Sequence, residues 1–151
     1  MIVRQATDAD IASVALLRRL WTDEDDGKPS GDPDFEATFA EWWAQERSRR
    51  EFWIAEDTEP VGFISLVEFS RMPRPTRPPS KWGYISNFYV RLEYRSAGVG
   101  QELLAAALKH ADERGYVRVV LSPTVRAIPL YQRAGFGPAD SLMLRQPPTT
   151  A

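Results

Sequence analysis

The residues with the clearest chemical potential stand in one segment, Val90 to Gln101, which reads Val-Arg-Leu-Glu-Tyr-Arg-Ser-Ala-Gly-Val-Gly-Gln. A strand-like run leads into this segment, and a helix-like run leaves it. The first amide N–H groups of a helix have no partner inside the helix, and the helix dipole favours negative charge there. Glycines let a ligand approach the backbone closely. The segment therefore predicts an anion site suited to a pyrophosphate.

Two common nucleotide motifs do not fit this segment. A phosphate-binding P-loop needs Lys and then Ser or Thr after its last glycine, but Gln101 follows Gly100. A dinucleotide fingerprint needs a third Gly or Ala where Leu103 stands, within an early strand-helix-strand unit. A module that binds ATP or NAD is therefore disfavoured.

A second segment makes a more specific comparison possible. The spacing Arg-x-x-Gly-x-Gly, here Arg95, Gly98 and Gly100, resembles the coenzyme A loop of the GCN5-related N-acetyltransferases. Downstream, Thr124 to Phe136 resembles that family's motif Asn-x-x-Ala-x-x-Leu-Tyr-x-x-x-Gly-Phe. The residues that match it are Ala127, Leu130, Tyr131, Gly135 and Phe136.

The resemblance implies an enzyme that moves an acetyl group from acetyl-coenzyme A to a primary amine, by direct attack of the amine on the thioester. It implies that backbone N–H groups of Ser96 to Gln101 hold the pyrophosphate, and that the preceding strand pairs with the pantetheine amides. The strand after the long helix would splay away. The cofactor-binding residues implied are Val90, Leu92, Arg95, Ser96, Ala97, Gly98, Val99, Gly100, Gln101 and Tyr131.

Proton transfer has one candidate acid and no obvious base. By resemblance, Tyr131 lies near the coenzyme A sulfur, where a phenol with a pKa of about 10 can protonate the departing thiolate. The alternative is that Tyr131 only packs on the cofactor. Many relatives carry a carboxylate in the long strand, where this chain has Ser86 and Asn87. Asn87 or Ser86 could hold a water, Glu68 could reach the site, or the acceptor amine needs no base.

The acceptor is expected to be a small-molecule amine first and a peptide amine second. A cationic acceptor would suit the acidic run Asp23 to Asp26, which otherwise is a solvated loop. The rival function is a non-catalytic acyl-coenzyme A sensor or interaction module of the same fold. Consumption of the thioester would distinguish the two.

The elements that position these residues follow from hydrophobic periodicity. The expected strands are 2–5, 52–56, 61–69, 82–92, 117–121 and 141–145, and the expected helices are 7–20, 32–43, 98–114 and 124–134. The early hairpin and the later strand-helix-strand units predict one α/β domain with a mixed, mostly antiparallel sheet and helices on both faces. The acyltransferase domain would span residues 1–146, with 147–151 as a frayed tail.

Four local features carry further expectations. Thr7 and Asp10 predict a helix-capping box, and Thr124 can cap the last helix. Pro129 would kink that helix or delay its start. Strict alternation places Trp82, Tyr84, Phe88, Val90 and Leu92 on one face of their strand. The Pro- and Arg-rich stretch 71–79 is expected to be a loop inside the domain.

Composition bounds the remaining possibilities. The chain has 151 residues, a net charge of -2, no cysteine and one histidine, His110. Disulfides and thiolate or poly-histidine metal sites are excluded, and nothing in the charge balance indicates nucleic acid or a membrane surface as a partner. We expect a cytoplasmic enzyme without a metal, whose exposed strand edges permit a homodimer.

Overall fold

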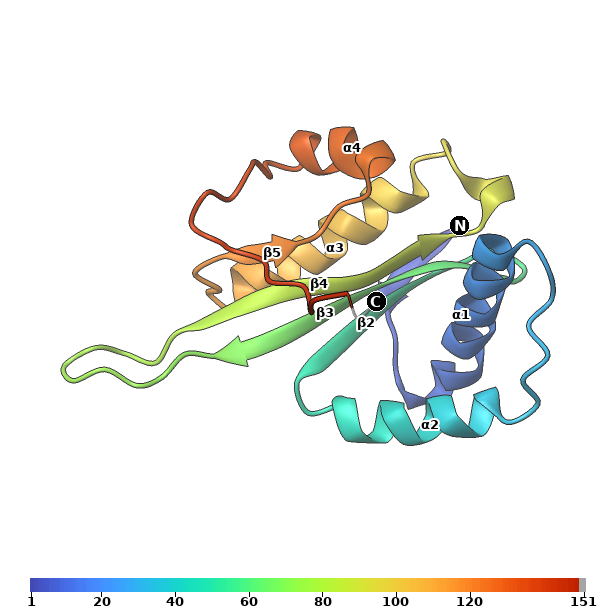
Figure 1. Ribbon diagram of the computed structural model, residues 1–151, viewed down its shortest axis with the longest axis horizontal. Helices are drawn as coiled ribbons and strands as arrows, with labels where there is room; N and C mark the ends of the chain where they lie inside the picture. The colour runs from blue at the N-terminus through green and yellow to red at the C-terminus, as the bar shows by residue number, and fades with distance from the viewer. Residues whose placement is uncertain (150–151) are drawn as a thin grey trace.

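Five strands form one mixed sheet in the order β1-β2-β3-β4-β5 (Figure 1). The computed structural model describes residues 1–149. The strands are β1 (Ile2–Gln5), β2 (Arg50–Glu56), β3 (Pro60–Ser70), β4 (Lys81–Val90) and β5 (Val119–Leu121). The first four pair antiparallel, and β5 pairs parallel with β4. The predicted single-domain α/β architecture is confirmed.

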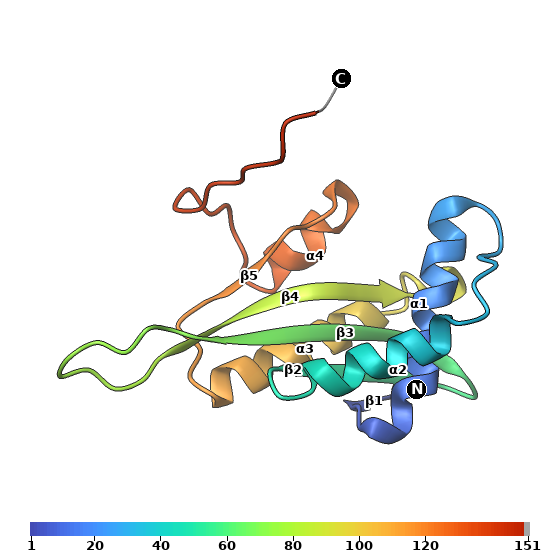
Figure 2. The same ribbon diagram turned by 60° about the horizontal axis from the view of Figure 1, so that its bottom comes forward.

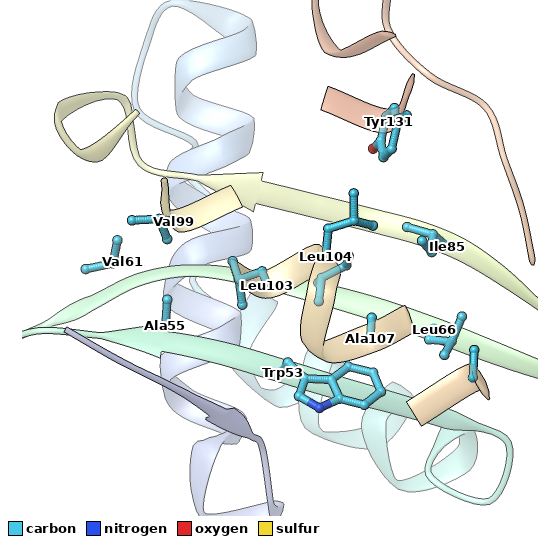
Figure 3. Packing of buried hydrophobic residues seen from close by; sticks show 12 residues of the cluster. Trp53, Ala55, Val61, Leu66, Ile85, Val99, Leu103, Leu104, Ala107 and Tyr131 are labelled. Carbon is cyan, nitrogen blue, oxygen red and sulfur yellow. The ribbon is translucent and has the colours of Figure 1, made fainter. Parts of the chain in front are cut away.

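Helices cover both faces of this sheet. Helices α1 (Ile11–Asp26) and α2 (Phe35–Glu46) pack on one face through a core that includes Leu17, Phe39, Trp43 and Phe63. Helix α3 (Val99–Glu113) packs on the other face through Leu103, Leu104 and Ala107 (Figure 3). The apolar stripes at helical spacing thus face the sheet, where their burial supplies the main stabilising free energy.

Helix α1 is longer than the sequence indicated. The polar stretch from Trp21 was expected to be a loop, but the helix continues to Asp26 and ends at Gly27, whose φ is 69°. Tertiary contacts explain the extension: Trp21 stacks on Tyr89 of β4, with ring centroids 5.6 Å apart. Packing against the sheet therefore outweighs the unfavourable placement of acidic residues at a helix C-terminus.

The start of the first helical segment agrees with the prediction. The hydroxyl of Thr7 accepts a hydrogen bond from the Ala9 N–H, and the Asp10 carboxylate accepts one from the Thr7 N–H at 2.8 Å. Arg4 also donates two hydrogen bonds to Asp10. This capping box begins a short 3-10 turn, Asp8–Asp10, that leads into α1.

Strand β4 contains a β-bulge at Ser86, and this corrects the predicted face assignment. Ser65 of β3 lies opposite Asn87, whereas the next residue, Leu66, lies opposite Ile85, so Ser86 has no counterpart. One extra residue reverses the alternation of side chains. Ile85 packs toward α3 before the bulge, and Phe88 and Val90 do so after it.

As a result, Trp82 and Tyr84 lie on the opposite face from Phe88 and Val90. Trp82 stacks on Phe69 of β3 with ring centroids 4.5 Å apart. Leu92 lies beyond the strand, in a 3-10 turn that spans Leu92–Tyr94 (η2), and is 64% exposed. Strict alternation therefore described only part of β4.

The last helix begins late, as Pro129 suggested. A 3-10 turn (η3, Val125–Ala127) precedes α4 (Ile128–Arg133), and Pro129 occupies the first turn of α4, where no backbone N–H is needed. Thr124 makes no side-chain capping bond, so that expectation is wrong. The backbone N–H of Ala127 bonds instead to the Thr124 carbonyl.

The expected strand at 141–145 does not form. Residues 137–149 contain no strand and lead away from the sheet (Figure 2). Met143 and Leu144 are 100% and 84% exposed, so the apolar spacing has no facing strand to pair with. The predicted tail at 147–151 is without regular structure through residue 149, and its last two residues lie outside the described residues.

Candidate functional site

Strands β4 and β5 separate at the middle of the sheet. Their parallel pairing covers only Gly83 to Ile85 on β4 and Val119 to Leu121 on β5. Strand β4 then continues for five more residues, to Val90, without a strand of the described residues beside that edge. The splay that the family resemblance implied is therefore present in the structure.

The freed edge of β4 presents backbone hydrogen-bonding groups. The Arg91 N–H, just past the end of β4, donates a hydrogen bond to the carbonyl of Val61 in β3 at 2.9 Å. In an antiparallel pair, alternate residues point their backbone groups to opposite edges. Phe88 therefore directs its N–H and C=O groups toward the gap and Val90 its N–H, whereas the Val90 carbonyl accepts a hydrogen bond from Arg95. An extended ligand with amide groups can pair with such an edge as an added strand does.

The loop before α3 brings together backbone amides that have no partner within the helix. Gly98, at the N-cap, has a φ of 85°, and Ser96 has a φ of 68°. No side chain caps the helix, and its first internal bond runs from the Glu102 N–H to the Gly98 carbonyl at 3.1 Å. The amides of residues 99–101 therefore have no partner within the helix and are available to a negatively charged group.

Arg95 braces this loop instead of pointing into it. Its Nε donates to the Val90 carbonyl at 2.8 Å, and its Nη2 donates to both carboxylate oxygens of Glu24, at 2.9 and 2.7 Å. The guanidinium carbon also lies 5.6 Å from the centre of the Tyr89 ring. These contacts fix the end of β4 against α1. Arg95 thus lies in the predicted region, but its guanidinium bonds to other residues of the protein and does not point into the loop.

Tyr131 projects from α4 toward β4 (Figure 3). It is 8% exposed and packs edge-on against Phe88 and Phe136, with ring centroids 6.3 and 5.7 Å away. Burial raises the pKa of the Tyr131 phenol, because the charged phenolate loses hydration. Tyr131 therefore stays protonated at neutral pH and keeps a proton that it can donate.

The end of α4 explains why Tyr131 is fixed. Gly135 has a φ of 97°, a conformation that glycine adopts without strain. It lets the Phe136 N–H return to the Tyr131 carbonyl at 3.0 Å, which closes the helix. The Gly-Phe pair of the sequence motif thus serves to hold the tyrosine backbone.

Ser86 and Asn87 lie at the bulge, directly past the last β4–β5 pair. Asn87 stands opposite the buried Ser65 of β3, so both point to the α1–α2 face. Ser86 accepts a hydrogen bond from Arg50 and donates one to the side-chain oxygen Oδ1 of Asn87 at 3.0 Å. The sequence analysis missed Arg50, because nothing in its local sequence indicates a contact with a residue 36 positions away.

Glu68 is not brought to this region. It lies opposite Gly83, three residues along β3 from Ser65, the partner of Asn87, or roughly 10 Å at 3.3 Å per residue, and its side chain is on the opposite face of the sheet from Ser65. Its carboxylate accepts hydrogen bonds from Arg114 at 2.6 Å and from the Tyr116 hydroxyl at 2.8 Å. The Arg114 guanidinium first, and then the Tyr116 hydroxyl, lower the pKa of Glu68 to about 2. These contacts show a structural carboxylate that is a poor base.

Two of the four residues in the acidic run at 23–26 are engaged within the protein, and Asp25 and Asp26 are exposed. Asp23 accepts a hydrogen bond from the Ser30 N–H at 2.7 Å, and Glu24 pairs with Arg95. Among the aromatic residues of α2, Phe39 and Trp43 are buried in the core. Trp42 is half-buried, and the Arg50 guanidinium carbon lies 4.8 Å from the centre of its ring.

Two surface features lie elsewhere. The loop at 71–79 forms the tip of a long β3–β4 arm (Figure 1). A hollow of about 410 Å³ at its base is lined by the cationic residues Arg71, Arg74, Arg77, Lys81 and Arg114.

His110 packs edge-on against Trp53 in the last turn of α3. Within residues 1–149 no cluster of three or more potential metal ligands occurs, and no helix is long and apolar enough to cross a membrane.

Comparison with known sequences points to one family. Residues 14–136 match the Acetyltransferase (GNAT) family. The N-acetyltransferase family 8 member 3 of Rattus norvegicus is 32% identical over 92 residues, which cover 56% of this chain and 37% of the rat protein. The glucosamine 6-phosphate N-acetyltransferase of Trypanosoma brucei brucei is 30% identical over 76 residues, 50% of each chain. This chain therefore spans at most about half of these curated relatives.

Solved structures share the whole fold. A predicted acetyltransferase from Clostridium acetobutylicum, solved with acetyl-CoA, has a TM-score of 0.76 and 20% identity and covers 96% of this chain and 95% of its own. A GCN5-related N-acetyltransferase from Ralstonia eutropha JMP134 has a TM-score of 0.70 and 27% identity, with coverage of 96% and 97%. The similarity covers nearly the whole length of this chain and of both solved structures.

Proposed function

We propose an activity for this chain from one established premise: the chain belongs to the GNAT family of acetyltransferases. Family membership and the names of the relatives support an acyltransferase. The proposed reaction moves an acetyl group from acetyl-coenzyme A to a primary amine of a small molecule. The amine attacks the thioester carbon directly, a C–N bond forms and the C–S bond breaks.

The observation that carries this proposal is the adjacency of three features at the splay. The free edge of β4 can pair with the pantetheine amides, and the unpaired amides of residues 99–101 can hold the pyrophosphate. Tyr131 contacts Phe88, which lies on that same edge. An extended ligand with an anionic end therefore has a complementary path that ends beside a protonated phenol.

In the proposed mechanism a side chain supplies the proton to the leaving group, whereas water removes the proton from the amine. Tyr131 donates its proton to the sulfur as the C–S bond breaks, because a thiol leaves more easily than a thiolate. Among the candidate bases, the Glu68 carboxylate is held by Arg114 and Tyr116, and neither Ser86 nor Asn87 accepts a proton at neutral pH. The amine therefore loses its proton to water, and the rate follows the fraction of free amine.

The experiment that tests the proposal is thermal unfolding with acetyl-coenzyme A, followed by an assay of thiol release with a panel of amines. A ligand that binds only the folded protein raises the unfolding midpoint. We expect acetyl-coenzyme A to raise it, while ATP and NAD do not, and we expect thiol release that depends on an amine. A shift without any turnover would favour the non-catalytic acyl-coenzyme A module instead. The absence of a shift would contradict both.

A further inference from the structure

A chain of hydrogen bonds connects the buried Arg50 to Asn87 at the proposed reaction centre. The Arg50 side chain is 9% exposed, and its Nη1 donates to Ser65 at 2.8 Å and also to Ser86. The Ser86 hydroxyl then donates to the Oδ1 atom of Asn87 at 3.0 Å. Asn87 itself is half-buried, so its side chain remains accessible to a ligand.

The donor and acceptor at each step of these hydrogen bonds follow from the guanidinium group of Arg50. A guanidinium carries only donors and cannot be deprotonated in a protein. Ser86 therefore accepts from Arg50 and must send its single proton elsewhere, and the Asn87 oxygen lies within reach. With its oxygen bound in this way, the Asn87 amide directs its NH₂ group away from Ser86. Within residues 1–149 that NH₂ group has no hydrogen-bond partner.

The local charge reinforces the donor character. Glu46 pairs with Arg50 at 2.7 Å and with Arg49 at 3.0 Å, so two guanidinium groups share one carboxylate. Both arginines also lie over aromatic rings, Arg50 over Trp42 and Arg49 over Phe69. These three groups together carry one excess positive charge, which disfavours a second cation on an acceptor bound beside them.

We infer that Arg50 and Ser86 are positioning residues that make Asn87 a hydrogen-bond donor to the acceptor substrate. The acceptor class selected in this way is a primary amine with an oxygen on a neighbouring carbon, such as an amino sugar or an aminoacyl amide. Polyamines and plain alkylamines lack the oxygen that Asn87 would bind. The inference rests on the proposed acetyltransfer and specifies its second substrate.

The test compares amines that carry an oxygen on a neighbouring carbon with matched amines that lack it. The pairs are 2-aminocyclohexanol with cyclohexylamine, and alaninamide with isopropylamine, with rates expressed per free amine. We expect the wild-type protein to favour the oxygen-bearing member in kcat/KM by about tenfold or more, since a hydrogen bond in a partly desolvated site contributes about 1–2 kcal/mol. Acetylation of neither oxygen-bearing amine, or an equal kcat/KM within each pair, would overturn the inference.

Two variants then assign the preference to the hydrogen-bond chain. In Asn87→Asp the side chain keeps its shape but offers only acceptors, so the preference should fall by about tenfold and diamines should become better substrates. In Ser86→Ala the amide is free to turn, and the preference should fall by about three- to tenfold. Ser13→Ala, at a half-buried position of α1 outside this hydrogen-bond chain, is the control and should keep the wild-type preference.

The readouts separate this inference from the proposed function. Because both variants lie on the acceptor face, the shift of the unfolding midpoint by acetyl-coenzyme A should be unchanged in each. A wild-type protein without that shift would defeat the acetyltransferase proposal itself. A normal shift and normal turnover, with the same preference in Asn87→Asp as in the wild type, would defeat only the role of Asn87.

Discussion

Tyr131 is the residue whose surroundings best match a chemical role. It is buried between two aromatic rings, and burial raises the pKa of its phenol. A purely packing tyrosine in such a site would be replaceable by phenylalanine without loss of activity. Removal of the hydroxyl alone therefore distinguishes a catalytic role of Tyr131 from a packing role.

We expect Tyr131→Phe to lower kcat by about 10²-fold, the effect of losing one proton donor. The midpoint shift caused by acetyl-coenzyme A should stay within error of the wild type, because the ring and its contacts remain. Steady-state thiol release and thermal unfolding measure the two quantities. Tyr94→Phe, which removes an exposed hydroxyl bonded to Glu59, is the matched control and should retain full kcat. An unchanged kcat in Tyr131→Phe would mean a packing role.

At the scale of elements, the start of α3 determines donor binding in the proposed mechanism. Ala97 is exposed in the loop before the helix, so a side chain added there meets solvent or ligand and leaves the core intact. A carboxylate at this position would repel a pyrophosphate and compete for the free amides.

Ala97→Glu should therefore weaken acetyl-coenzyme A binding by about tenfold or more, measured by isothermal titration calorimetry. Ala97→Gln has the same size without the charge and should bind within about threefold of the wild type. Circular dichroism checks that both variants keep the fold. Equal affinities for the two variants would place the anion site somewhere other than the start of α3.

The carboxylate of Glu68 connects β3 with the end of α3, and its energetic role depends on pH. Hydrogen bonds from Arg114 and Tyr116 lower the pKa of Glu68 from 4.5 to about 2. Because the pKa is lower in the folded protein, the contribution to stability is complete above about pH 4.5. It is lost as the pH falls through about 2, below which the carboxyl is protonated in both states.

We expect Glu68→Gln to lower the free energy of unfolding by about 1–2 kcal/mol at pH 7. The difference from the wild type should shrink steadily between pH 4.5 and pH 2, as measured by urea denaturation across that range. Glu113→Gln removes only an exposed pair with Lys109 and should cost less than about 0.5 kcal/mol at any pH. A deficit in Glu68→Gln that does not depend on pH would contradict this account.

The sequence predicted those elements that local patterns determine. The capping box at Thr7, the β2–β3 hairpin and the late start of α4 at Pro129 each depend on residues within a few positions of one another. The bulge at Ser86, the extension of α1 and the contact of Arg50 with Ser86 depend on contacts between distant segments. The expected strand at 141–145 failed for the same reason, since a strand exists only with a neighbour.

At the scale of the whole molecule, charge is unevenly distributed although the net charge is only -2. The cationic hollow lies at the base of the β3–β4 arm, and the glycine loop lies at the other end of β4. Nine residues separate Lys81 from Val90, which corresponds to roughly 30 Å of strand. That separation exceeds the screening length of about 8 Å at physiological salt.

The triple variant Arg71→Gln, Arg74→Gln, Arg77→Gln should therefore bind acetyl-coenzyme A within about twofold of the wild type at physiological salt. Calorimetry measures the affinity. A tenfold loss would mean that the anionic donor is held at the arm and not at α3. In the same assay Ala97→Glu should weaken binding, whereas the triple variant should leave it unchanged.

The bulge in β4 has a consequence for how the length of this strand can change. The bulge accommodates Ser86 as one extra residue, and the pairing of β3 with β4 continues on either side of it. A deletion of Ser86 would join Ile85 directly to Asn87, restore strict alternation and leave Phe88 and Val90 facing α3 and Tyr89 in the core beneath α1. Such a deletion would remove the hydroxyl that bonds Asn87 while both cores keep their residues. The bulge therefore lets β4 gain or lose this one residue without an exchange of residues between the two cores.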